Sequence, residues 1–263
     1  TLKSQLKGYT SIEENVLVAV GAETYTIERP MIDIQREVIN DIRSNFKPEE
    51  KLTPDLFTLN DAAVIAQKTN VKPGTFNLVI QKECYFPVIE KIEIKPDPNA
   101  YHLKRRLISK PRQVNVLIKS SFGDVKVDPD TLILGSENIK EGQNVKPGTY
   151  PLVIKKRGYH PLTDEIVIEP SDKAYLLRRT IEAMPVLVKY EISHDFDEKL
   201  ITPEVISLND KLVDQKTAFA PGKYGLRIEK IGYSPLKKEV LIEPSDQPYI
   251  LKEMMISITR EIE

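Results

Sequence analysis

Apolar residues alternate with other residues over short runs, and proline or glycine bounds these runs along the whole chain. Val114, Val116 and Ile118 are each separated by one other residue, and Leu152 and Ile154 repeat this spacing after a Pro-Gly pair. A two-residue period is typical of a β-strand that buries one face. The pattern therefore predicts short strands joined by tight turns.

Seen over a longer stretch, these runs amount to about six or seven short strands between recurring turn signals, which is typical of a β-sandwich. The segment 32–45 is the one place where the spacing of isoleucine and valine would also suit a helix. It aligns with the first strand of the other copies described below, so we predict a strand there as well.

The turn signals themselves repeat. Pro73-Gly74, Pro147-Gly148 and Pro221-Gly222 lie 74 residues apart. Three more landmarks keep the same spacing, namely an aromatic corner, an Ile-x-Pro motif and a later tyrosine. They are Tyr85, Tyr159 and Tyr233, then Ile94, Ile168 and Ile242, then Tyr101, Tyr175 and Tyr249. Fixed spacing of several independent landmarks indicates a tandem repeat architecture.

Incomplete copies flank the three complete ones. Gly8-Tyr9 is followed by Tyr25 at the spacing that separates Tyr159 from Tyr175, and the segment 255–261 echoes 31–37. We therefore expect residues 1–30 to be the C-terminal part of a preceding repeat and 255–263 the start of a following one. The complete repeats are then 31–110, 111–184 and 185–254, and the chain is expected to be a segment of a longer repeat protein.

The links between the predicted repeats are short. Only Glu182, Ala183, Met184 and Pro185 separate the last strand of one repeat from the first strand of the next. A link of this length and composition is too stiff to act as a flexible tether. We therefore predict an all-β tandem array of small β-sandwich domains that forms an elongated rod, in which neighbouring repeats of the chain are each other's main partners.

The strings KPGTY, GYHPL and IVIEPSD give the sequence a resemblance to the PEGA domain family, and more loosely to transthyretin-like and carboxypeptidase-regulatory-like β-sandwiches. The resemblance covers nearly the whole chain, although Cys84 stands where that family has glycine. It implies a β-sandwich fold and an association with prokaryotic envelope, S-layer-like and surface proteins. From it we expect an extracellular or cell-envelope location.

Composition argues against several functions. The 38 basic and 39 acidic residues nearly cancel to a net charge of −1 and form no block, so nothing points to nucleic acid or a membrane surface. No apolar run approaches the roughly 20 residues of a membrane helix. Cys84 is the single cysteine, which excludes an internal disulfide.

No residues suggest catalysis, since no nucleophile and base are placed to converge. The chain has no tryptophan, and every tyrosine is explained as a repeated packing or corner residue, so no aromatic sugar platform is left over. The three histidines have no cysteine or histidine partner at zinc-ligand spacing. We therefore expect no enzyme and no catalytic or cofactor-binding residues.

Two acidic loops are weak candidates for calcium, a cation that takes six to eight oxygen ligands. A solvated turn is the better supported alternative, because the first repeat has a lysine in the corresponding loop. The candidate ligands are Asp124, Asp128 and Asp130 in the second repeat and Asp195, Asp197 and Glu198 in the third.

Three functions remain open. The first is a structural spacer, stalk or filament component of a prokaryotic surface or extracellular assembly, with other copies as possible partners. The second is an adhesin-like module that binds glycan or protein through loops that vary between repeats, such as 138–144 and 210–217. The third is an accessory array of an enzyme whose catalytic domain lies outside this chain.

Overall fold

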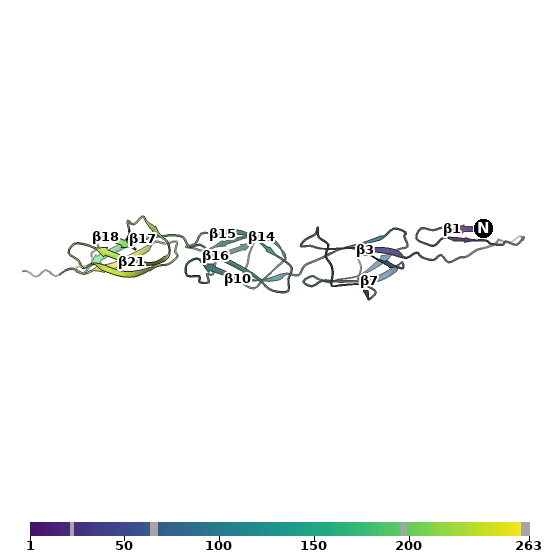
Figure 1. Ribbon diagram of the computed structural model, residues 1–263, viewed down its shortest axis with the longest axis horizontal. Coiled ribbons are helices and arrows are strands. Elements are labelled where there is room, and N and C mark those ends of the chain that lie inside the picture. The colour runs from purple at the N-terminus through teal and green to yellow at the C-terminus, as the bar shows by residue number, and fades with distance from the viewer. Residues whose placement is uncertain (22–23, 64–67, 196–198, 259–263) are drawn as a thin grey trace, which may run out of the picture. The chain divides into compact units, whose positions relative to one another are not determined.

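A computed structural model describes residues 1–21, 24–63, 68–195 and 199–258. Every element of secondary structure within these ranges is a β-strand, as Figure 1 shows. None of these residues forms a helix able to cross a membrane. The prediction of an all-β fold built from small sandwiches is confirmed, and the helical alternative for 32–45 is wrong, because Arg36–Ser44 is a strand.

Contacts divide the chain into two compact units. The first holds Thr1–Arg112, Asn144–Gly148 and Ile168–Ala174, and the second holds Gln113–Gln143, Thr149–Val167 and Tyr175–Glu263. The division runs through the predicted second repeat, so the repeat boundaries stay predictions. The three segments 31–110, 111–184 and 185–254 are called the first, second and third repeat below.

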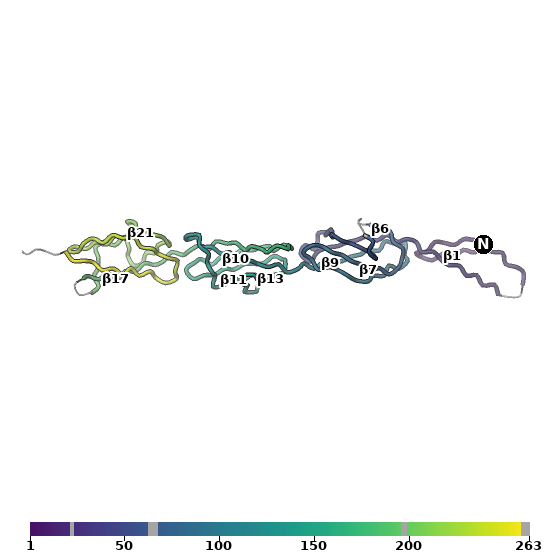
Figure 2. The backbone as a smooth tube through the Cα atoms, turned by 90° about the horizontal axis from the view of Figure 1, so that it is seen from below, coloured from purple at the N-terminus to yellow at the C-terminus, as the bar shows by residue number. Residues whose placement is uncertain are grey.

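In the first repeat, two sheets form the sandwich: a mixed sheet with strand order β6-β3-β9 and an antiparallel sheet with strand order β5-β4-β7-β8. A short hairpin, β1 with β2, precedes it. The path of the chain through β6, β7 and β9 can be followed in Figure 2. The strands are β1 (Leu2–Ser4), β2 (Ile12–Glu14), β3 (Arg36–Ser44), β4 (Leu56–Leu59), β5 (Ala62–Ala63), β6 (Lys68–Val71), β7 (Gly74–Gln81), β8 (Val88–Ile94) and β9 (Tyr101–Leu107).

The second and third repeats have the same strand orders, β13-β10-β16 with β12-β11-β14-β15, and β20-β17-β23 with β19-β18-β21-β22. The strands of the second are β10 (Arg112–Ser120), β11 (Thr131–Leu134), β12 (Glu137–Asn138), β13 (Gln143–Val145), β14 (Gly148–Lys155), β15 (Leu162–Ile168) and β16 (Tyr175–Ile181). Those of the third are β17 (Val186–His194), β18 (Val205–Leu208), β19 (Lys211–Leu212), β20 (Ala218–Phe219), β21 (Gly222–Glu229), β22 (Leu236–Ile242) and β23 (Tyr249–Met255).

The first and last strands of each repeat pair in parallel, whereas the neighbours in the four-stranded sheets pair antiparallel. The register is the same each time, because the landmark tyrosine that begins the last strand stands opposite a valine of the first. The pairs are Val38 with Tyr101, Val114 with Tyr175 and Val188 with Tyr249. The repeat seen in the sequence is therefore a repeat of strand register.

Side chains from both sheets fill each core. In the first repeat, Leu78 and Ile80 on β7 are fully buried against Val38 and Ile42 of β3 and Ile94 of β8. Alternate residues on a strand point to opposite faces, so the two-residue period seen in the sequence puts one apolar face inside the sandwich. The third repeat has the corresponding core, which includes Val188, Ile192, Leu226, Ile228 and Ile242.

The hairpin turns follow from residues that tolerate a left-handed backbone. Asn60 and Asp61 have φ of 51° and 63°, and Asn209 and Asp210 have φ of 45° and 63°. Two successive residues of positive φ match the twist of a tight hairpin. The side chain of Asn60 also accepts a hydrogen bond of 2.7 Å from the backbone of Asn77 on the neighbouring strand β7.

Truncating a core residue should destabilise its repeat. Ile80→Ala removes a fully buried side chain, and we expect it to lower the free energy of unfolding by about 2–5 kcal/mol. Ile89→Ala is the matched control, because Ile89 is 70% exposed on the neighbouring strand, and it should cost less than about 1 kcal/mol. Chemical denaturation measures both values, and equal losses would contradict the sandwich core described here.

Candidate functional site

A four-residue turn that carries the aromatic corner precedes the last two strands of each repeat. This turn and its counterpart in the N-terminal segment, at 7–10, 83–86, 157–160 and 231–234, are called the tyrosine turns. In the second repeat, Tyr159 N donates to Lys156 O at 3.2 Å, and Gly158 has φ of +79°. A type II turn requires a positive φ at its third residue, and glycine is favoured at that position. The glycine of the motif is thus fixed by local geometry.

The tyrosine turn holds the link that leaves its repeat. In the second repeat, His160 N donates to Glu182 O at 2.8 Å and Met184 N donates to Gly158 O at 2.9 Å. The other three turns make the same pair of backbone bonds: Thr10 to Ile32 and Ile34 to Gly8, Phe86 to Ile108 and Lys110 to Cys84, and Ser234 to Ile256 and Ile258 to Gly232. The link is therefore bound as soon as it leaves the last strand.

A side chain after the first strand adds a third bond to the same link. Asn45 Oδ1 accepts from Ser109 N at 2.8 Å, and Ser121 Oγ accepts from Ala183 N at 3.0 Å. In the third repeat Asp195 takes this place, and its two carboxylate oxygens accept from the backbone and the hydroxyl of Ser257. The tyrosine turn and the segment after the first strand thus both bind the outgoing link.

In each of the three repeats, a carboxylate holds the first part of the tyrosine turn. Asp130 accepts from Lys156 Nζ at 2.9 Å and from Arg157 N at 2.8 Å. These bonds stabilise the charged form and lower the pKa of Asp130. The hydrogen bond from Lys156 has the larger effect, and that from the backbone N–H of Arg157 adds to it. Asp55 and Glu204 have the same role in the first and third repeats, and their pKa values are also lowered.

The glycine of a tyrosine turn lies against a second turn, from the repeat that follows; the segments 96–99, 170–173 and 244–247 are called the proline turns. A Cβ placed on Gly8 would lie 2.5 Å from Pro96 C, and one placed on Gly158 would lie 2.6 Å from Ser245 N. Both distances are shorter than any real Cβ contact, so backbone meets backbone here and no side chain fits between.

The proline turns are themselves capped by a side chain. Asp97 Oδ1 accepts from Asn99 N at 2.8 Å, and this bond, together with Lys7, lowers the pKa of Asp97. A short polar side chain that bonds its own backbone two residues on is a common way to fix a turn. Ser171 and Ser245 make the corresponding bonds to Lys173 N and Gln247 N.

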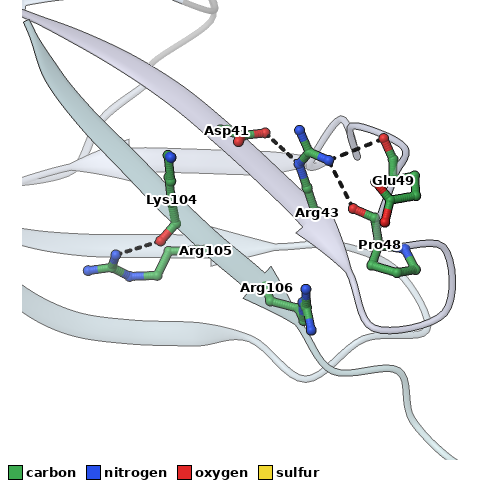
Figure 3. A pocket seen from close by; sticks show the side chains of 7 residues that line it. All are labelled: Asp41, Arg43, Pro48, Glu49, Lys104, Arg105 and Arg106. Carbon is green, nitrogen blue, oxygen red and sulfur yellow. Dashed lines mark hydrogen bonds and ion pairs between the residues drawn. The ribbon is translucent and has the colours of Figure 1, made fainter.

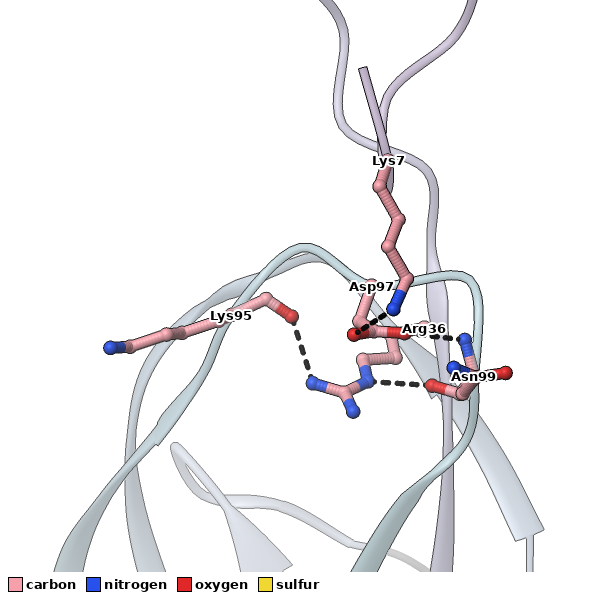
Figure 4. A network of polar contacts seen from close by, with 5 residues as sticks. All are labelled: Lys7, Arg36, Lys95, Asp97 and Asn99. Carbon is pink, nitrogen blue, oxygen red and sulfur yellow. Dashed lines mark hydrogen bonds and ion pairs between the residues drawn. The ribbon is translucent and has the colours of Figure 1, made fainter.

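Figure 4 shows the contact between the N-terminal segment and the first repeat. Lys7 Nζ lies 3.2 Å from Asp97 Oδ2 and links the two turns. Arg36, at the start of β3, donates to Asn99 O at 2.8 Å and Lys95 O at 3.0 Å, and so holds the proline turn from inside the repeat. The arrangement joins two rigid turns by backbone contact and adds one ion pair at the surface.

Cys84 is the exception among the tyrosine turns, because it replaces glycine at φ of +67°. Its sulfur and the carboxylates of Glu83 and Asp172 lie within 4.8 Å of one another. Burial is the main cause that raises the pKa of the Cys84 thiol, and the two negative charges add to it. A raised pKa keeps the thiol protonated and unreactive.

The reactivity of Cys84 can be measured through the pH dependence of alkylation. Since only the thiolate reacts, iodoacetamide should modify Cys84 more slowly than free cysteine near neutral pH, and the rate should rise at a higher pH. The same chain unfolded in urea is the control and should follow free cysteine. A midpoint at or below that of free cysteine would contradict the environment described for this thiol.

Two of the three calcium candidates of the second repeat already have partners. Lys119 Nζ lies 2.6 Å from Asp124 Oδ2, and Asp130 is bound by Lys156 and the tyrosine turn. Asp128 is exposed and lines, with Asp130, a cavity of about 250 Å³ beside the loop 138–144. The part of the chain that the structure describes does not gather ligand atoms of these three carboxylates in one place.

The candidates of the third repeat divide differently. Asp195 binds the outgoing link through Ser257, whereas Asp197 and Glu198 lie outside the described residues. The calcium hypothesis therefore stays a prediction. The role that the structure shows for Asp130 and Asp195 could not be predicted from neighbouring residues, because each depends on a partner more than 25 residues away in the chain.

The outer face of β3 and β9 carries a basic groove that sequence reasoning missed. Its volume is about 490 Å³, and Figure 3 shows its lining side chains. Arg43 is held by Asp41 at 2.9 Å and by the carbonyls of Pro48 and Glu49. The hydrogen bond from Arg43 is the main cause that lowers the pKa of Asp41.

Lys104 and Arg106 lie beside Arg43 on this face, and both are exposed. By strand register, the third repeat has Ser193 in place of Arg43 and Met254 in place of Arg106. The second repeat keeps a cation at two of these places, with Lys119 in place of Arg43 and Arg178 in place of Lys104, and has Thr180 in place of Arg106. The full set of three cations is thus found in the first repeat and in neither of the other two. The run Lys104-Arg105-Arg106 was the available sequence signal.

Comparisons with known proteins give only distant similarities. No protein-family model matches, and no curated protein matches. Among solved structures, the Bacillus anthracis TIE protein is 14% identical, with a TM-score of 0.36. The alignment covers 87% of this chain, which spans about half, 51%, of that protein.

Two pilins are also similar. A streptococcal ancillary pilin is 8% identical over 86% of this chain and 100% of its own, with a TM-score of 0.28. BcpA, the major pilin subunit of Bacillus cereus, is 10% identical over 85% of this chain and 99% of its own, with a TM-score of 0.29. All three TM-scores are low, so these similarities carry no argument about the function of this chain.

Proposed function

We propose that the chain is a non-catalytic structural spacer, part of a longer repeat protein in a prokaryotic cell-surface or extracellular assembly. The resemblance to PEGA domains supports the location, and the repeated junction supports the role as a spacer. Stalks and filaments of this kind hold other parts at a set distance, and other copies of the chain are the expected partners in a filament.

The single observation that carries the proposal is the way each link is bound. Two backbone bonds from the tyrosine turn and one side-chain bond hold the outgoing link. A link fixed at three points is already ordered in the folded chain. Pulling on its ends therefore orders it little further, and the distance that it spans changes little. Such a junction suits a protein whose function depends on the distance between its ends.

The spacer function predicts how size grows with the number of repeats. In small-angle X-ray scattering, the longest dimension should increase by a constant amount for each repeat added, because bound links prevent adjacent repeats from folding back. A chain in which Gly-Ser residues replace the link 182–185 is the matched control and should give a broader distance distribution. A compact particle whose longest dimension does not grow with repeat number would contradict the proposal.

The basic groove of the first repeat favours a second candidate function, binding of an anionic polymer. Arg43, Lys104 and Arg106 place three cations on one exposed sheet face, and Asp41 together with the carbonyls of 48 and 49 fixes the first of them. A fixed cation beside two exposed ones can attract a chain of negative charges. This function would operate beside the spacer function.

Removing the exposed cations tests this binding. Lys104→Ala and Arg106→Ala should each weaken binding to heparin by about fivefold at low salt, since one cation near an anionic surface contributes about 1 kcal/mol. Lys252→Ala, at the position of Lys104 in the third repeat, is the control and should change little. Equal effects of Lys104→Ala and Lys252→Ala would show that the groove has no special role.

A further inference from the structure

The tyrosine turn of the third repeat is fully formed. Tyr233 N donates to Lys230 O at 3.1 Å, Gly232 has φ of +86°, and Glu204 accepts from Ile231 N at 2.7 Å. The link beyond it is bound in the usual way, with Ile258 N donating to Gly232 O at 2.9 Å. In all these respects this turn matches the turn at Gly158.

One feature sets it apart. A Cβ on Gly158 would lie 2.6 Å from the backbone of Ser245, but a Cβ on Gly232 would meet no described atom within 4 Å. The described residues therefore leave open at Gly232 the surface that a proline turn covers at Gly8 and Gly158. The turn has the glycine that a close backbone contact requires, and within the described chain it lacks that contact.

The rim of this open surface is apolar. Ile231 is 84% exposed, and Ile256 and Ile258 of the bound link are 59% and 54% exposed. The position of Ile231 is held by Lys7 in the N-terminal segment, where it pairs with Asp97, and by Arg157 in the second repeat. Exposed apolar side chains that lie around an unfilled backbone contact mark a surface for a protein partner.

We propose that the tyrosine turn 231–234 binds the proline turn of a further repeat of this kind, joined to the chain after Ile258. The occupant is a reverse turn of the form Ile-x-Pro-Ser or Ile-x-Pro-Asp, with an apolar residue placed to cover Ile231. This inference rests on the proposed spacer function and names the partner of its last junction.

The other junctions support this choice of occupant. The link bound at Gly8 leads into the repeat that supplies Pro96, and the link bound at Gly158 leads into the repeat that supplies Ser245. In both, the docked turn belongs to the repeat that the bound link enters. The link bound at Gly232 is held by the same two backbone bonds, so the same rule assigns its docked turn to the repeat after Ile258.

A lengthened chain tests the proposal. A second copy of residues 184–257 inserted after Ser257 brings a proline turn to Gly232 through a natural link. Gly232→Ala is then made in the original and in the lengthened chain, and the rate of proteolysis in the link after Met255 is measured. Alanine at a left-handed position strains the backbone of both chains by the same amount. The difference between the two changes in cleavage rate therefore reports the docked turn alone.

In the lengthened chain, Gly232→Ala should speed cleavage of this link by about tenfold, the factor expected for roughly 1.4 kcal/mol of lost docking. In the original chain the change should be no more than about twofold to threefold, as for a strained turn without a partner. Gly158→Ala should speed cleavage of the link 182–184 in both chains. Gly123→Ala, a left-handed glycine with no backbone neighbour, should speed neither.

Equal effects of Gly232→Ala in the two chains would overturn the proposal. It would also be overturned if the original chain associated with itself as its concentration rose and Gly232→Ala prevented this, because the occupant would then be a second copy. The spacer function is tested separately by scattering. A lengthened chain can gain a constant increment in size while showing no docking at Gly232, so the two failures are distinguishable.

Discussion

At the junctions of Gly8 and Gly158, backbone atoms of two turns meet with no room for a side chain between them. At Gly8 and Gly158 this close approach and a positive φ both require glycine, so two independent constraints select the same residue. A contact between backbones is short and stiff, since neither partner can move by rotating a side chain. The geometry of these two contacts therefore depends on the turns themselves and not on side-chain packing.

The bonds around the turns are individually weak, and their effect comes from acting on the same few residues. A hydrogen bond contributes about 0.5–1.5 kcal/mol net, and each link receives two from the tyrosine turn and one from a side chain after the first strand. Because the three bonds act on one short segment, they remove most of its freedom together. The carboxylates of Asp55, Asp130 and Glu204 then hold the turn that makes two of these bonds.

The sequence was sufficient to predict the strands, the hairpin turns and the repeat, because all three follow from local spacing and from residues such as Asn60 and Gly158 that suit particular φ values. The site was harder, because it depends on pairs distant in the chain. Asp130 and Asp195 looked like cation ligands when only neighbouring acidic residues were considered, and the structure places each on a turn or link. The basic groove was missed because β3 and β9 meet only through long-range pairing.

The residue before the glycine position differs at every tyrosine turn, while the backbone bonds stay the same. Lys7 faces Asp97 through an ion pair, Glu83 lies beside Asp172 with the same sign of charge, and Ile231 is apolar and exposed. Side chains at this position cannot set the turn, since four different ones accompany one hydrogen-bond pattern. They lie at the edge of the contact, where charge and hydrophobicity decide which surfaces suit each other. The backbone bonds are thus common to all the junctions, and the edge residue is free to distinguish one junction from the next.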